Sequence, residues 1–205
     1  MIPRKLFGPF AFAIVLLIGA CSEPDARLEK LAANDVILAF GDSLTFGTGA
    51  PDGQSYPDML SLLSAREVIN AGVPGELSAD GLTRLSDVLD NITPRLLVLC
   101  HGGNDMLRKK NLGKARQNIE AMIALAKERD IAVLLLGVPK PGIWLSTAEM
   151  YAEIAATTAT PILADTIATI LGDSGLKSDP VHPNAAGYRQ LAEDVHEILT
   201  DLGAL

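Results

Sequence analysis

The amino-acid sequence predicts an α/β fold, in which helices cover a parallel β-sheet. Five short apolar runs predict the strands, because they lack alternation and are bounded by Gly, Pro, Asp or Asn, as is typical of strands buried on both faces. Helical stretches lie between these runs, and strands that alternate with helices form βαβ units with parallel strands.

The expected elements can be placed along the chain. The clearest helix is Lys114 to Arg129, because Ile119, Met122 and Ile123 form one apolar stripe with charges opposite. The expected strands are Val36 to Phe40, Val68 to Ile69, Leu96 to Cys100, Ala132 to Leu136 and Pro161 to Ala164. The other expected helices are Pro57 to Ala65, Ala79 to Leu89, Thr147 to Ala156 and Ala185 to Leu202.

Length and composition predict one globular domain. The 205 residues contain no internal repeat, and 48% of them are hydrophobic against 20% charged, which excludes a disordered chain. The net charge of −8 argues against nucleic acid as a partner. The run from Arg108 to Lys110 is too short to alter this, and we expect it to be a solvated loop.

The N-terminus has the pattern of a signal peptide. Arg4 and Lys5 precede the apolar stretch from Phe10 to Ile18, which is shorter than the roughly 20 residues that span a bilayer. The sequence Ile18-Gly19-Ala20-Cys21 resembles the bacterial lipobox, in which the cysteine is lipidated. The alternative is an ordinary cleaved signal with an incidental cysteine.

The lipobox resemblance divides the chain into three parts. Residues 1–20 would be a lipoprotein signal peptide, residues 21–34 the lipidated Cys21 with a tether, and residues 35–205 the folded domain. It implies a membrane partner through the lipid and a place in the bacterial cell envelope. Ser22 after the cysteine favours an outer-membrane lipoprotein that faces the periplasm. Cys100 would then be the one remaining thiol, expected to be a small buried hydrophobe.

Polar residues follow the predicted strands, where parallel sheets bind their ligands. Ser43 stands just after the first strand, but neither a phosphate-binding glycine loop nor Gly-x-Ser-x-Gly surrounds it. No His or Cys spacing indicates a metal. The residues after the first four strands are Gly41 to Ser43, Asn70 to Gly72, His101 to Asp105 and Gly137 to Gly142.

A serine nucleophile needs a base within hydrogen-bond reach, and that base must be oriented by a third group. In the loop "DPVHP", Asp179 and His182 are held between Pro180 and Pro183, so the carboxylate can bind the imidazole Nδ1 proton. The alternative makes Asp179 a turn former and Asn184 a helix cap, with His182 incidental.

Acyl transfer also needs donors aimed at the developing oxyanion. The candidates are the Ser43 N–H at an expected helix N-terminus, the Gly72 N–H and the Asn104 side-chain amide. Each has a structural alternative, because Gly72 could simply end a strand and Asn104 could cap a turn. His101 is expected to line the same pocket, with Asp105 nearby.

These motifs resemble the conserved blocks of the SGNH hydrolase, or GDSL esterase/lipase, superfamily. "GDSLT" contains Ser43, "NAGVPG" Gly72, "GGND" Asn104, and "DPVHPN" Asp179 and His182, in the family order. The resemblance is greatest to the arylesterase, thioesterase I and lysophospholipase L1 group. It implies a flavodoxin-like three-layer α/β/α fold with strand order 2-1-3-4-5, and ester hydrolysis without a metal or other cofactor.

Two departures from the family pattern affect the expected acyl pocket. The group often has Gly-Asp-Thr where this chain has Gly75-Glu76-Leu77, and the loop from Lys140 to Ser146, with Trp144, is not assigned to a pattern of the family. The expected pocket residues are Asp42, His101, Pro139 and Trp144. The predicted function is therefore a serine esterase acting on a small-molecule or lipid ester. The alternatives are a polysaccharide O-deacetylase of the same fold and a non-catalytic ligand-binding envelope lipoprotein.

Overall fold

The computed structural model describes residues 27–142 and 145–205. The expected signal peptide, Cys21 and the first part of the tether lie outside the described residues, and so does Trp144. The described residues form one five-stranded sheet in the order β2-β1-β3-β4-β5, with every neighbouring pair parallel. The predicted α/β fold and strand order are confirmed.

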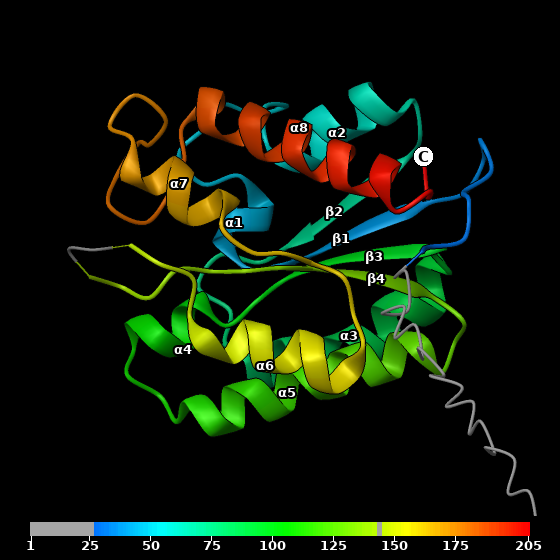
Figure 1. Ribbon diagram of the computed structural model, residues 1–205, viewed down its shortest axis with the longest axis horizontal. Coiled ribbons are helices and arrows are strands. Elements are labelled where there is room, and N and C mark those ends of the chain that lie inside the picture. Colours follow the sequence, from blue (N-terminus) through cyan, green and yellow to red (C-terminus); the bar gives the residue numbers. More distant parts are fainter. Residues whose placement is uncertain (1–26, 143–144) are drawn as a thin grey trace, which may run out of the picture.

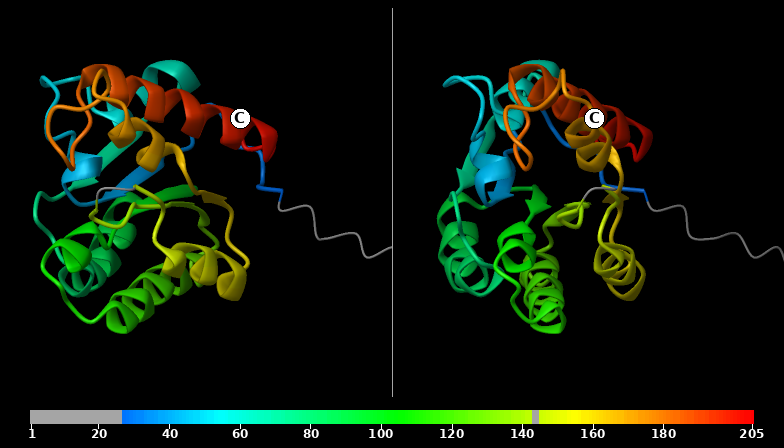
Figure 2. Two further views of the ribbon diagram at one scale, coloured as in Figure 1. Left: turned by 60° about the vertical axis from the view of Figure 1, so that its left-hand side comes forward. Right: turned by 90° about the vertical axis from the view of Figure 1, so that its left-hand side faces the viewer.

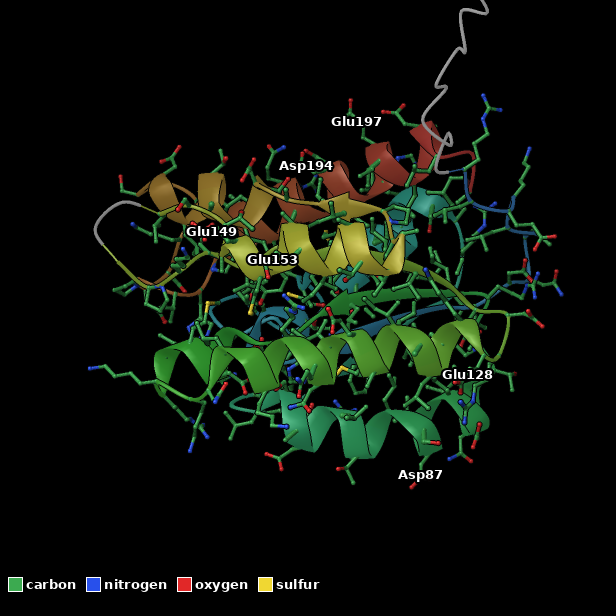
Figure 3. All side chains as sticks on the ribbon, turned by 60° about the horizontal axis from the view of Figure 1, so that its bottom comes forward. Asp87, Glu128, Glu149, Glu153, Asp194 and Glu197 are labelled. Carbon is green, nitrogen blue, oxygen red and sulfur yellow. The ribbon has the colours of Figure 1, made fainter. Side chains whose placement is uncertain are left out.

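Two helical layers enclose the sheet (Figures 1 and 2). The helices α2, α7 and α8 cover one face, and α3, α5 and α6 cover the other. Among the described residues, no helix combines the length and the apolar character needed to cross a membrane. Acidic side chains project from helices of both layers (Figure 3), so the negative charge is distributed over the helical surface.

The three inner strands form the core. All of β1 and β3 is buried, and so is β4 after its first residue, whereas the edge strands β2 and β5 are only partly buried. The expectation that all five strands are buried on both faces is therefore wrong for the edges, which have one neighbour each. The strands are β1 (Ile37–Gly41), β2 (Val68–Gly72), β3 (Leu96–Cys100), β4 (Ala132–Leu136) and β5 (Ile162–Leu163).

The predicted helices are present, with ends that differ by no more than three residues. They are α2 (Tyr56–Ser64), α3 (Ser78–Ile92), α5 (Leu112–Lys127), α6 (Glu149–Thr158) and α8 (Ala185–Asp201). The sequence predicted only the start of α1 (Ser43–Phe46) and missed α4 (Gly103–Leu107) and α7 (Thr166–Gly172). Elements of four to seven residues are too short to display a helical period.

Local capping explains where the long helices begin. Ser55 and Asp58 form a reciprocal capping box at the start of α2, and Pro57 occupies its first turn. Asn184 accepts a hydrogen bond from Gly187 N at the start of α8, so the helix cap that belonged to the alternative interpretation of this loop is present.

The register of the sheet brings three strand ends to one level. Gly41 at the end of β1 pairs with Gly72 of β2 on one side and with Cys100 of β3 on the other. The short helices α1 and α4 begin within a few residues of these ends, at the left of Figure 1. Parallel sheets bind ligands at this edge.

Candidate active site

Ser43 is the first residue of α1, directly beyond the end of β1. Asp42 caps the helix, because its Oδ1 accepts a hydrogen bond from Leu44 N at 3.1 Å. A Cβ at Gly41 would lie 2.1 Å from Cys100 O and 2.4 Å from Thr45 Oγ1, so only glycine permits this tight exit from the strand. The serine is thus held on a short, closely packed turn.

The C-terminal loop brings an imidazole to this serine. His182 Nε2 lies 3.0 Å from Ser43 Oγ, and His182 Nδ1 lies 2.7 Å from Asp179 Oδ2. Both distances are within hydrogen-bond range. The structure therefore joins Ser43, His182 and Asp179 in one continuous chain of hydrogen bonds.

The loop that carries His182 is closed by its own backbone. Asp179 Oδ1 accepts hydrogen bonds from the N–H groups of Val181 and His182 at 2.8 and 2.9 Å. Ser178 N donates to His182 O at 3.0 Å. The orientation of the carboxylate relative to the ring is thus fixed by several contacts.

The charge of Asp179 determines which ring nitrogen carries the proton. Desolvation raises the pKa of Asp179, but hydrogen bonds from His182 and from Val181 N–H outweigh it and hold the pKa below its ordinary value. An ionised carboxylate can only accept, so Nδ1 of His182 carries the proton. Nε2 is then available to accept the hydroxyl proton of Ser43.

Asn104 lies at the start of α4 and is bound to the residue before the serine. Its Nδ2 donates to Asp42 Oδ2 at 3.0 Å. Asp42 is 2% exposed, and desolvation by this burial raises its pKa, although charge and hydrogen-bond contacts oppose the rise. Asp42 therefore fixes the amide of Asn104 relative to Ser43.

A cavity of about 170 Å³ opens beside these residues. Ser43, Asn104 and His182 line it, and so do Asp42 and Pro139 from the sequence prediction. The rest of the wall is mainly apolar, with Leu107, Val138, Leu171 and Val181 among its members. An apolar part of a ligand can occupy the cavity while a polar part of the same ligand contacts Ser43.

Gly72 does not lie at this cavity. Its N–H donates to Asn70 Oδ1 at 2.9 Å, and a Cβ at this position would lie 2.1 Å from Phe46 N. The assignment of Gly72 as an oxyanion donor is therefore corrected. The residue lacks a side chain because α1 packs closely on the end of β2.

The second glycine of "NAGVPG" presents a different N–H. Glu76 N donates to Val73 O at 3.1 Å and Gly75 has φ +79°, which with Pro74 corresponds to a type II β-turn. Within residues 27–142 and 145–205, Gly75 N donates no hydrogen bond. The motif contains two glycines, and only the first of them, Gly72, was predicted as a donor.

His101 is also absent from the cavity wall. Its ring is fully buried, Nδ1 accepts from Gly102 N at 3.1 Å, and Nε2 lies 3.1 Å from Glu76 Oε2. The expectation that His101 lines the pocket is corrected, because its side chain is directed towards α3 and Glu76.

The Glu76 carboxylate beside His101 is ionised. Its desolvation raises the pKa, but a bidentate pair with Arg84 and the contact with His101 lower it to about 2. The two Arg84 hydrogen bonds measure 2.8 and 2.7 Å, the geometry of a strong charge-assisted pair.

Comparisons with known proteins agree with this geometry. Residues 39–190 match the GDSL-like lipase/acylhydrolase family. Esterase TesA of Pseudomonas aeruginosa is 31% identical over 186 residues, which cover 85% of this chain and 92% of that protein. Thioesterase 1/protease 1/lysophospholipase L1 of Escherichia coli K12 is 27% identical over 184 residues, or 86% and 83% of the two chains. The crystal structure of AlinE4, an SGNH-hydrolase family esterase, has a TM-score of 0.64 and 32% identity over 84% of this chain and 98% of that one.

The fold and these matches define the class of protein, a hydrolase of the SGNH type with a three-layer α/β/α fold. The chain belongs to the GDSL-like lipase/acylhydrolase family, whose model covers most of its length. It is a carboxylic ester hydrolase.

The lowered pKa of Glu76 predicts how stability changes in acid. Folding favours the ionised carboxylate, so its stabilisation is fully present above the ordinary pKa of 4.5 and is lost as the pH falls towards about 2. Glu76→Gln should therefore be less stable than the wild type at pH 7, and the difference should narrow between pH 4.5 and 2. Urea unfolding midpoints at several pH values would measure this.

The matched control for this series is Glu128→Gln, at an exposed position labelled in Figure 3. It should unfold at about the wild-type urea concentration throughout. If the stability difference between Glu76→Gln and the wild type stays constant down to pH 2, Glu76 is not stabilised in its ionised form.

Proposed function

We propose that this protein hydrolyses carboxylic esters through a covalent acyl-enzyme, with Ser43 as nucleophile, His182 as general base and acid, and Asp179 as the group that orients His182. The observation that carries the proposal is the chain of two hydrogen bonds, 3.0 and 2.7 Å long, from Ser43 through His182 to Asp179. The alternative in which His182 is incidental does not account for these contacts.

The proposed reaction has two half-steps. Ser43 Oγ attacks the ester carbonyl while His182 Nε2 takes its proton, and the tetrahedral intermediate expels the alcohol, which receives that proton. Water then attacks the acyl-enzyme with His182 again acting as base, and the acid product leaves with Ser43 protonated. No cofactor takes part in either half-step.

Three donors are proposed for the oxyanion. The Ser43 N–H stands at the beginning of α1, and Asn104 Nδ2 has a second hydrogen besides the one bound to Asp42. In place of Gly72 we propose the Gly75 N–H. The turn of Gly75 is attached to the end of α4, because Arg108 Nη2 donates to Gly75 O at 2.9 Å.

The proposed substrate is an ester with an apolar acyl group. The mainly apolar cavity beside Ser43 favours an acyl chain over a sugar, which weighs against a polysaccharide O-deacetylase. The relatives named esterase, arylesterase and lysophospholipase support an ester as the substrate. A series of p-nitrophenyl esters from acetyl to palmitoyl would define the preferred chain length.

We also propose that the protein is exported and attached to the bacterial envelope by lipid at Cys21. The support is the sequence pattern alone, in which two basic residues precede an apolar stretch that ends at Ile18-Gly19-Ala20-Cys21. An outer-membrane lipoprotein that faces the periplasm is the finer form of this proposal.

Replacing the proposed nucleophile should remove the activity. We expect Ser43→Ala to reduce kcat at least about a thousandfold, since loss of the nucleophile leaves only binding and oxyanion contacts. It should also abolish labelling by a fluorophosphonate. Ser174→Ala, at an exposed loop serine, is the control and should behave as the wild type. Retained turnover in a folded Ser43→Ala protein would remove Ser43 from this role.

Removal of the Asn104 amide should reduce kcat on the order of a hundredfold or more, because one oxyanion donor is lost in the transition state. Asn104→Ala and the wild type would be compared by kcat for p-nitrophenyl acetate, with melting curves to verify the fold. Asn91→Ala, on the exposed surface of α3, is the control. An unchanged kcat in Asn104→Ala would refute the oxyanion assignment.

The lipid anchor can be tested by labelling cells with radioactive palmitate. The full-length chain should incorporate the label, and Cys21→Ala should not. Cys100→Ala is the matched control and should remain labelled, because Cys100 is buried in β3. An unlabelled wild-type protein would overturn the lipid anchor.

A further inference from the structure

Two of the proposed oxyanion donors come from segments with little regular structure. Gly75 lies in the turn between β2 and α3, and Asn104 lies in the five-residue helix α4. Neither segment is long enough to fix the position of a donor by helix or strand hydrogen bonds alone. Contacts between side chains must therefore hold the two segments together.

The first contact joins Glu76, next to Gly75, with His101, three residues before Asn104. His101 Nδ1 accepts the Gly102 N–H, so the ring proton lies on Nε2 and is donated to Glu76 Oε2 at 3.1 Å. The buried ring is pressed against α3, where a Cβ at Gly81 would lie 2.3 Å from Nε2. The two ring contacts and the packing against Gly81 thus hold His101 in the orientation that reaches Glu76.

The acceptor for His101 is itself held firmly. Arg84 forms two hydrogen bonds with the Glu76 carboxylate and a third with Ala71 O at 3.1 Å. The guanidinium also lies 4.1 Å from the centre of the Phe40 ring in β1. Glu76 is therefore anchored to α3 and to the ends of β1 and β2.

Two more contacts join the segment of Asn104 to the segment of Gly75. Asp105, adjacent to Asn104, accepts hydrogen bonds from Ser78 N and Ser78 Oγ, both at 2.9 Å. Arg108 donates to Gly75 O. The turn that presents Gly75 and the segment that presents Asn104 are consequently joined at three places.

We propose that Glu76 and His101 are positioning residues, which set the place of the Asn104 amide and the Gly75 N–H around the oxyanion. This inference rests on the proposed function and adds to it a polar group that does not line the cavity. Its effect should appear in kcat more than in KM, because oxyanion donors act chiefly in the transition state. Displacement of such groups by about 1 Å can cost about a hundredfold in rate.

The central comparison is between His101→Leu and His101→Gln. Leucine fills the buried site without a donor, whereas the glutamine amide can still donate to Glu76. We expect His101→Leu to lower kcat about ten- to a hundredfold per active site titrated with a phosphonate, with little change in KM. His101→Gln should recover most of this loss. Equal kcat per active site in His101→Leu and the wild type would overturn the proposal.

A double-mutant cycle tests whether His101 acts through the oxyanion donors. In an Asn104→Ala background, His101→Leu should cause a smaller further loss than it does alone, because one donor that it positions has gone. Full additivity of the two losses would overturn the link to Asn104. If His101→Leu does not fold, Ser78→Ala replaces it in the same cycle. This variant removes the Oγ contacts with Asp105 and with Asn118 Nδ2, and it keeps the Ser78 N–H contact with Asp105.

The control for a general loss of stability is Ser64→Ala. Ser64 is buried, and its Oγ donates to Leu60 O within α2, outside the positioning group. This variant should unfold earlier but keep the wild-type kcat per titrated site. The kcat values of the other variants separate the two proposals. A wild-type kcat in Asn104→Ala refutes the proposed oxyanion site. A reduced kcat in Asn104→Ala together with a wild-type kcat in His101→Leu refutes the positioning role alone.

Discussion

The hydrogen bond between Ser43 and His182 joins residues that are 139 positions apart. It forms only when the last helix is in place, since the loop that carries His182 leads directly into α8. Tyr188 on α8 is fully buried and donates to Thr48 O at 2.9 Å, just beyond α1. The packing of α8 on α2 thus brings the two ends of the site together (Figure 1).

Small residues allow the backbone to approach closely around this bond. A side chain at Gly49 would collide with Ser178 and with Pro183 O, and thus with the loop of His182. At Gly187 it would meet Leu176 O. These positions have a steric requirement that adds to the turn preferences of glycine. They explain why the short α1 and the loop of His182 can lie against each other.

The sequence predicted the architecture and much of the geometry of the candidate site for clear physical reasons. Parallel strands expose their carboxyl ends at one edge, and two prolines restrict the loop of His182, so Ser43, Asp179 and His182 could be proposed as neighbours from their positions. Gly72 and His101 were misplaced because both follow or end a strand. Position along the chain does not reveal which side of the sheet edge a group faces. Packing decides which side a group faces. Phe46 packs against Gly72, and the His101 ring packs against Gly81.

The side chain of Asp179 is 44% exposed, whereas that of His182 is 18% exposed. Water and dissolved ions therefore surround much of the carboxylate, and the attraction between the two groups acts through a high effective dielectric. Its Coulombic contribution should weaken with ionic strength, while the directional hydrogen bonds of the loop are retained. In the proposed mechanism, Asp179 thus contributes more by holding the angle of the imidazole than by the strength of its electric field.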